Sequence, residues 1–225
     1  MRTSYLKNLD LVIRKIERAR LAYSPHHIVS LLAVSKYATT EQIQILHECG
    51  QRAFGENKVQ DLKHKSQALE SLPLEWHMIG TLQENKINAL IELAPALLHS
   101  LDSLKLALAL QKRLESKGKT MRALLQLNTS FESSKSGVPP AQAAELYHAI
   151  LSQCPNIKLE GVMTIGAHSG DYRVVERSFV LAKEVFDSLQ DFGARTLSMG
   201  MSEDFEIAIA CGANVVRIGS RLFAH

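Results

Sequence analysis

Cysteines and long hydrophobic runs are scarce in this sequence. Cys49, Cys154 and Cys211 are its only cysteines, and they form no C-x-x-C pair. A sparse, odd set of this kind is typical of a reducing compartment and argues against a disulfide framework. No run reaches the roughly 18 apolar residues that a membrane-spanning helix needs, and the charged N-terminal segment has no apolar signal core. We therefore expect a cytoplasmic protein that does not bind membranes.

The chain also lacks a large excess of charge of either sign. Its formal net charge is +3, with 22% charged and 46% hydrophobic residues, as in an ordinary soluble globular protein. The positive charges are too few and too dispersed for a nucleic-acid-binding surface. No cluster of His, Cys, Asp or Glu has the spacing of a metal site, and no G-x-S-x-G or Walker motif occurs. We expect a monomer that binds neither nucleic acid nor a metal ion.

Apolar segments of strand length alternate with amphipathic segments of helix length along the chain. The expected strands are residues 29–35, 52–55, 75–79, 96–100, 121–127, 157–164, 196–199 and 214–218. Seven helices are expected between them, and another, over residues 3–22, precedes the first strand with Leu6, Leu9, Ile13 and Ile16 on one face. Strict alternation implies parallel strands. Eight of them in a chain of this length favour a single α/β (β/α)8 barrel of the TIM type with an extra N-terminal helix.

An open, doubly wound sheet is the second candidate fold. That fold usually has a glycine-rich turn after its first strand, and residues 36–39 contain no glycine. No linker or repeat divides the chain. We expect one domain over residues 1–225, with the N-terminal helix inside residues 1–24 and the barrel over residues 29–225.

Polar residues at several expected helix starts have the spacing of N-terminal caps. Thr39 and Thr81 are each followed three residues later by a glutamine or glutamate, which is the spacing of a capping box. Ser202 directly precedes the helix expected over residues 203–210 and is expected as its cap.

One lysine stands at the end of a buried strand. Residues 31–35 form an unbroken apolar run that ends on Ser35, and Lys36 follows. A run without alternation predicts a strand that is buried on both faces. A lysine at its end can lie half out of water, which lowers its pKa and makes the amine a nucleophile toward carbonyl groups. The alternative is a lysine that points to solvent and only marks the strand end.

The last two expected strands end in residues that suit a phosphate group. Loops after strands seven and eight are the usual phosphate site of the barrel fold. Gly200 and Gly219 allow the backbone to approach an anion, Ser202 and Ser220 offer hydroxyl groups, and Arg217 offers a fixed positive charge. Taken one at a time, Ser202 can also be explained as a helix cap and the glycines as turn residues. Together with Lys36 across the barrel mouth, they favour a phosphate site.

A phosphorylated ligand beside a carbonyl-seeking lysine leaves two chemical classes open. One is a Schiff-base aldolase, and the other is a protein that holds pyridoxal 5′-phosphate (PLP) on the lysine. Glu203 and Asp204 would repel a phosphate unless they point outward. His77 inside a strand is more often a hydrogen-bonded core residue than a catalytic one.

Several motifs occur in order along nearly the whole chain and resemble the pyridoxal phosphate homeostasis protein family. They are Ala33–Lys36, Phe54–Asn57 with Val59-Gln60, Trp76–Gly80 with Leu82-Gln83 and Asn85-Lys86, Ser134–Gly137, Leu197–Ser202, and Val216–Ser220. The resemblance implies the PLP-binding barrel of alanine racemase without that enzyme's second domain, because the barrel already accounts for 225 residues.

The resemblance also implies a role for individual residues. Lys36 would form the Schiff base with PLP. The other cofactor-binding positions implied are the phosphate contacts Ser202, Gly219 and Ser220, the neighbouring Met201, the pyridine-nitrogen partner Arg217, and the pocket residues Asn57, His77 and Met163.

The implied function is PLP binding and intracellular PLP (vitamin B6) homeostasis without strong catalysis. A cation at the ring nitrogen disfavours its protonation and makes the ring a poorer electron sink. Lys36 could serve one face of a substrate as acid or base, and no residue is identified for the other face. PLP-requiring apo-enzymes are the expected recipients. The alternatives are an amino-acid racemase or a related PLP enzyme, and an aldolase that acts on a sugar phosphate.

Overall fold

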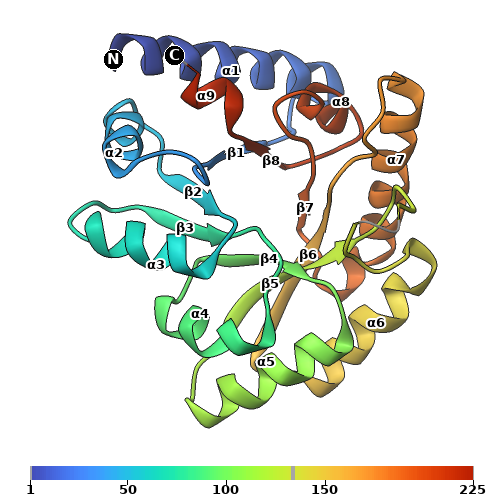
Figure 1. Cartoon of the computed structure of the whole chain (residues 1–225). Helices are drawn as coiled ribbons and strands as arrows, with labels where there is room; N and C mark the ends of the chain where they lie inside the picture. The colour runs from blue at the N-terminus through green and yellow to red at the C-terminus, as the bar shows by residue number, and fades with distance from the viewer. Residues whose placement is uncertain (1, 133–134, 225) are drawn as a thin grey trace.

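Eight parallel strands close into a barrel in the computed structural model, which describes residues 2–132 and 135–224 (Figure 1). Neighbours in the sequence pair in order from β1 to β8, and β8 pairs with β1 to close the ring. The strands are β1 Ser30–Val34, β2 Ala53–Glu56, β3 Glu75–Met78, β4 Leu97–Leu101, β5 Met121–Leu127, β6 Ile157–Thr164, β7 Thr196–Ser198 and β8 Val215–Ile218. The predicted (β/α)8 barrel is therefore confirmed.

Helices surround the barrel on its outside (Figure 1). One precedes β1, and each later strand follows at least one helix. Their bounds are α1 Arg2–Tyr23, α2 Thr40–Glu48, α3 Val59–Ala68, η1 Glu84–Lys86, α4 Ile87–Leu93, α5 Leu104–Ser116, α6 Pro140–Gln153, α7 Tyr172–Ser188, η2 Gln190–Phe192, α8 Phe205–Ala210 and α9 Ser220–Phe223. The short helix α9 was not expected from the sequence. Ser134, part of one recognised motif, lies outside the described residues.

Helix α1 packs beside α8 and α9, the two helices next to the expected phosphate site (Figure 1). Its buried residues are Tyr5, Leu9, Val12 and Ile16. The predicted face was partly wrong, because Leu6 and Ile13 of that face are exposed. Residues 5, 9, 12 and 16 recur every three or four positions and so lie along one side of the helix. The N-terminal helix thus packs against the last two helices of the chain, α8 and α9.

Two strands carry an extra residue that changes their register. Leu98 of β4 pairs with residue 123 of β5, and Leu101 pairs with residue 125, so β4 spans one residue more than β5. The same occurs in β6 near Gly161, whose φ is +145° and where a Cβ atom would lie 2.0 Å from the Thr196 carbonyl oxygen. Such irregularities re-aim side chains next to functional sites. The one in β4 includes His99, which is fully buried.

Two of the predicted helix caps are wrong. Thr39 forms the expected capping box with the third residue of its helix. Thr81 caps no helix, because the chain runs on to Gln83 before the 3₁₀ helix η1 begins. Ser202 also caps no helix. Its segment forms a turn in which the Asp204 backbone N–H donates to the Met201 carbonyl, and α8 begins after that turn, at Phe205. In both cases the loop extends further than the local pattern predicts.

Candidate functional site

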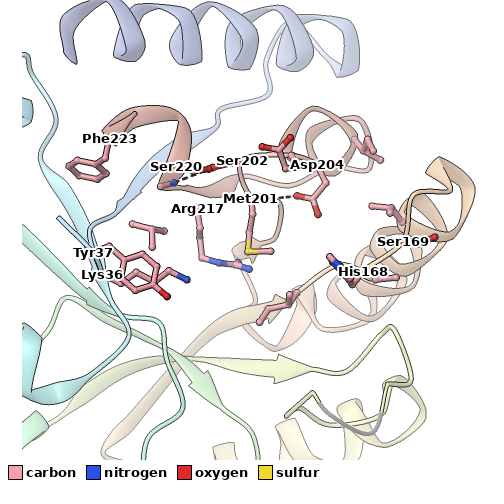
Figure 2. A pocket seen from close by; sticks show the side chains of 18 of the residues that line it. Lys36, Tyr37, His168, Ser169, Met201, Ser202, Asp204, Arg217, Ser220 and Phe223 are labelled. Atoms are coloured by element: carbon pink, nitrogen blue, oxygen red, sulfur yellow. Dashed lines mark hydrogen bonds between the residues drawn. The ribbon is translucent and has the colours of Figure 1, made fainter. Parts of the chain in front are cut away.

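A cavity of about 1110 Å³ opens at the C-terminal ends of the strands. Its wall comes mainly from the loops after β1, β6, β7 and β8, with Lys135 from the loop after β5. Figure 2 shows side chains from these loops extending into it. Six of the nine predicted binding residues line the cavity: Lys36, Met201, Ser202, Arg217, Gly219 and Ser220. Strand ends that are far apart in the sequence therefore meet at one site, as barrel topology requires.

The amine of Lys36 is available for chemistry. In residues 2–132 and 135–224 it has no hydrogen-bond or ion-pair partner, and its nearest aromatic contact is the Tyr37 ring, 4.9 Å from Nζ to the centroid. Lys36 is exposed in the open cavity, whereas the sequence predicted a half-buried side chain. Lys135, on the same cavity wall, is different: its Nζ donates to Glu132 Oε1 at 2.7 Å and to the Gly166 carbonyl at 2.8 Å.

The loops after β7 and β8 are joined to each other at the proposed phosphate site. The Gly219 backbone N–H donates to the Ser202 hydroxyl at 3.3 Å, and Ser202 is buried. The backbone N–H groups of Ser202 and Glu203 find no acceptor within the described part of the chain. Gly200 shapes the loop with a φ of +92°, and a Cβ there would lie 2.6 Å from Ala208 Cβ. This loop therefore offers free N–H donors to an anion.

The two acidic residues beside these donors point in different directions. The Glu203 side chain is 84% exposed and pairs with Arg221 at 3.4 Å, so it turns away from the donors. Asp204 lines the cavity and accepts the Met201 N–H at 2.5 Å. Burial raises the pKa of Asp204, although the Met201 N–H and the charge of Arg217 oppose the rise. Both residues line the cavity, but the charge of Glu203 is offset by Arg221, whereas Asp204, among the described residues, accepts only from a backbone N–H.

Arg217 reaches the cavity from inside the barrel and is held there by three acceptors. Its Nη1 donates to the Ser198 carbonyl at 2.9 Å and to the Ser198 hydroxyl at 2.8 Å, and its Nη2 donates to the Thr164 carbonyl at 2.9 Å. Burial lowers its pKa to about 10, which leaves the guanidinium charged at neutral pH. A guanidinium has five N–H groups, so two have no acceptor among the described residues and are available to a ligand.

The other three predicted binding residues do not line the cavity. Asn57 follows β2, and its carbonyl oxygen lies against Gly80. Met163 is buried with Leu97 and Leu124 in a small cluster, against which a residue of the cavity wall packs. His77 lies inside the barrel and is hydrogen-bonded to two side chains. None of the three therefore contributes to the cavity lining.

Some cavity residues had no role assigned to them from the sequence. The loop over residues 165–170, which follows β6, forms one side of the cavity and includes His168. The His168 N–H donates to Glu132 Oε1 at 3.2 Å. The position of residues 165–170 directly after a strand was the one feature of the sequence that could have indicated a site, since this loop contains no motif. His99 was also missed, although a polar residue inside the apolar run of β4 marks it.

Two neutral histidines lie behind Arg217. Burial lowers the pKa of His77, with Arg122 lowering it further while Glu75 opposes the shift. Burial also holds the pKa of His99 well below its usual value, and the nearby His77 and Arg217 add to the effect. Both rings are therefore uncharged at neutral pH, and each nitrogen must act either as donor or as acceptor.

The buried His99 predicts a loss of stability in mild acid. Below about pH 6.5 the unfolded chain protonates this imidazole and the folded protein does not, so the free energy of unfolding falls as pH falls. At pH 5.5 the loss from His99 alone is about 1.4 kcal/mol relative to pH 7.5. Urea unfolding at the two pH values measures it. His99→Asn should remove this part of the difference, whereas the exposed His64→Asn should keep it. Equal pH differences in wild type and His99→Asn would contradict the prediction.

No group of three or more His, Cys, Asp or Glu within residues 2–132 and 135–224 is arranged to hold a metal ion. No helix that the structure describes has the length and apolar character needed to cross a membrane.

Comparison with known proteins places the chain in a family. Residues 8–225 match the family model of the alanine racemase N-terminal domain. The pyridoxal phosphate homeostasis protein of Helicobacter pylori is 60% identical over 219 residues, which cover 97% of this chain and 98% of the relative. The protein of the same name from Aquifex aeolicus is 38% identical over 223 residues, with 97% of each chain covered.

Solved structures agree with this assignment. PipY of Synechococcus elongatus, solved with PLP bound, has a TM-score of 0.79 and 34% identity, with 93% of this chain and 100% of that chain covered. Alanine racemase from Corynebacterium glutamicum has a TM-score of 0.75 at 17% identity, with 98% of this chain but 60% of the racemase covered, and this likeness shows the fold alone. The resemblance read from the sequence motifs is confirmed, and the chain belongs to the pyridoxal phosphate homeostasis protein family.

Proposed function

We propose that this protein binds PLP as a Schiff base on Lys36 and takes part in intracellular PLP homeostasis, without strong catalysis of its own. The observation that carries the proposal is the amine of Lys36, which has no hydrogen-bond or ion-pair partner among the described residues. It lines the same cavity as Arg217 and the β7–α8 loop, whose Ser202 and Glu203 N–H groups have no acceptor among those residues. The name of the Helicobacter pylori relative and the PLP bound to PipY support the choice of ligand.

The described residues fit the parts of this cofactor. Ser202, Gly219 and Ser220 are the proposed phosphate contacts, since hydroxyl and N–H groups meet there. Met201 lies beside them on the cavity wall. Arg217 is the proposed partner of the pyridine nitrogen, because two of its N–H groups are unused.

The three residues outside the cavity lining have a different proposed part. Asn57, His77 and Met163 would shape the pocket from outside rather than touch the cofactor, since none of them lines the cavity.

The charge of Arg217 argues against strong catalysis. Bound PLP supplies an aldehyde for imine formation and a ring that can accept electrons. A guanidinium that stays charged at neutral pH disfavours protonation of the ring nitrogen and so weakens the ring as an electron sink. Because the cavity is open, water also reaches the face of the bound cofactor at which a substrate would react. The proposed role is to hold the aldehyde and release it to PLP-requiring apo-enzymes, as a monomer in the cytoplasm.

Loading, trapping and transfer test the proposal. The purified protein is incubated with PLP, desalted, reduced with borohydride and digested, and peptide masses then locate the attached pyridoxyl group. We expect it on Lys36. The unreduced, loaded protein should then activate a PLP-requiring apo-enzyme. Absence of bound PLP would overturn the binding proposal. Rapid, Lys36-dependent incorporation of solvent deuterium at the α-carbon of an amino acid would instead identify a racemase or a related enzyme.

A further inference from the structure

A chain of hydrogen bonds crosses the barrel interior from β3 to β8. His77 Nε2 lies 2.7 Å from Glu75 Oε1, and His77 Nδ1 lies 2.9 Å from His99 Nε2. His99 Nδ1 lies 3.1 Å from the Ser198 hydroxyl, which accepts from Arg217 Nη1 at 2.8 Å. His99 and Ser198 are fully buried, whereas the Glu75 side chain is 56% exposed. The chain therefore links a surface carboxylate to the guanidinium in the cavity wall.

The carboxylate fixes the direction of the first two bonds. An ionised carboxylate can only accept, so His77 Nε2 carries the proton and donates to Glu75. In a neutral ring the other nitrogen, His77 Nδ1, is then an acceptor. His99 must donate to it from Nε2, which leaves His99 Nδ1 as an acceptor in turn.

The remaining bonds follow in the same direction. The Ser198 hydroxyl donates its only proton to His99 Nδ1, and its lone pairs stay free to accept from Arg217. Every donor in the chain therefore points from Arg217 toward Glu75. The opposite order would set a lone pair of His77 against the carboxylate and leave the Ser198 proton without an acceptor. The observed distances thus fit one proton arrangement.

We propose that His77, His99 and Ser198 are positioning residues that lock the side chain of Arg217, so that its two unused N–H groups face the cavity. Arg217 emerges from the barrel at the cavity, and its other three N–H groups are committed to Ser198 and Thr164. The consequence for a bound cofactor rests on the proposed function, whereas the proton arrangement does not.

The proton arrangement is tested on the protein without added PLP. Long-range ¹H–¹⁵N correlation spectra of histidine-labelled protein report which ring nitrogen carries the proton, and the signals are assigned by their loss in His77→Gln and His99→Gln. We expect the proton on Nε2 of both rings. A proton on Nδ1 of either ring would overturn the proposal.

A small substitution tests the link to Arg217. Ser198→Ala should leave the His99 proton on Nε2, because Glu75 and His77 still fix it. It should shift the ¹⁵N resonance of His99 Nδ1, which loses its donor, and weaken retention of PLP about tenfold, through loss of a hydrogen bond to a charged group. The matched control is Ser100→Ala, which removes the neighbouring buried hydroxyl that donates to the Gly80 carbonyl and should change neither readout. An unchanged His99 Nδ1 resonance in Ser198→Ala would overturn the chain.

The two proposals fail in different ways. Wild type that binds no PLP yet shows both Nε2 protons would refute the proposed function alone. Unchanged PLP retention in Ser198→Ala, with a shifted His99 Nδ1 resonance, would overturn the locking of Arg217. A further variant, Glu75→Ala, changes only the exposed end of the chain. It should give a mixture of tautomers at His77, and an unchanged His77 would contradict the role of the carboxylate.

Discussion

Lys36→Ala is expected to abolish the visible absorption band of protein that has been loaded with PLP and desalted. A Schiff base needs a primary amine, and the Lys36 amine is the one in the cavity wall that lacks a hydrogen-bond or ion-pair partner among the described residues. The remaining contacts of PLP would be noncovalent, so most of the cofactor should also leave during desalting. Absorption spectra of wild type and variant, taken side by side, measure both effects.

Lys135→Ala is the matched control for this experiment. Lys135 lies on the same cavity wall, but its amine is held by Glu132 and by the Gly166 carbonyl. We expect the variant to keep the band. A band that survives in Lys36→Ala and disappears in Lys135→Ala would move the attachment to Lys135. Absence of a band in the wild type would contradict PLP binding altogether.

The sequence predicted the barrel well because the strands are buried on both faces. Residues 121–127 and 157–164 were expected as strands and form β5 and β6 with the same bounds. Short, mostly apolar segments between turn residues define such strands without any knowledge of their neighbours. Parallel order then followed from the alternation with helices, and strand order around the ring followed from the βα connections.

Local patterns failed where tertiary contacts decide the conformation. Thr81 has the spacing of a capping box, yet its segment stays extended up to Gln83. Ser202 has the position of a cap, yet its hydroxyl accepts from Gly219, which follows another strand. Leu6 was placed on the buried face of α1, whose true face is set by contact with α8 and α9. None of these contacts is visible in a local window of sequence.

The cavity-lining residues were predictable to the extent that topology alone places them. Lys36, Arg217 and Ser220 stand at strand ends, and barrel closure brings strand ends together. The link from His77 to Arg217 was not predictable, because it passes through His99 and Ser198, which lie on the non-adjacent strands β4 and β7. It also involves the register irregularity of β4, which no periodic pattern reveals.

The largest effect on stability is expected from breaking a buried ion pair beneath Lys36. Lys65 Nζ on α3 donates to Glu56 Oε1 at 2.8 Å and to the Ser35 carbonyl at 2.7 Å. The Ser35 hydroxyl donates to the same Glu56 oxygen at 2.6 Å. The Glu56 side chain is 0% exposed and that of Lys65 is 10% exposed. The pair therefore holds the end of β1, directly before Lys36, against α3.

Lys65→Met is expected to lower the free energy of unfolding by about 3–5 kcal/mol, because it leaves the buried carboxylate of Glu56 without a cation. Lys63→Met, at an exposed position on the same helix, should cost less than about 0.5 kcal/mol. Urea unfolding curves of wild type and both variants give the two values, if all three show the same dependence of the free energy of unfolding on urea concentration. A loss below about 1 kcal/mol in Lys65→Met would show that the Glu56 carboxylate is neutralised or hydrated in the folded protein.

A double variant separates two contributions to the lost free energy of unfolding: the Glu56 carboxylate left without a cation, and the lost packing around the Lys65 side chain. In Glu56→Leu/Lys65→Met both charges are gone, and apolar groups replace them between the barrel and α3. The Ser35 hydroxyl keeps an acceptor, since it lies 3.4 Å from the Gly55 carbonyl. Replacing a buried ion pair by apolar residues of similar size is often nearly neutral, so the double variant should be more stable than Lys65→Met by at least about 2 kcal/mol. If the double variant is no more stable, the loss in Lys65→Met comes from packing around the Lys65 side chain instead.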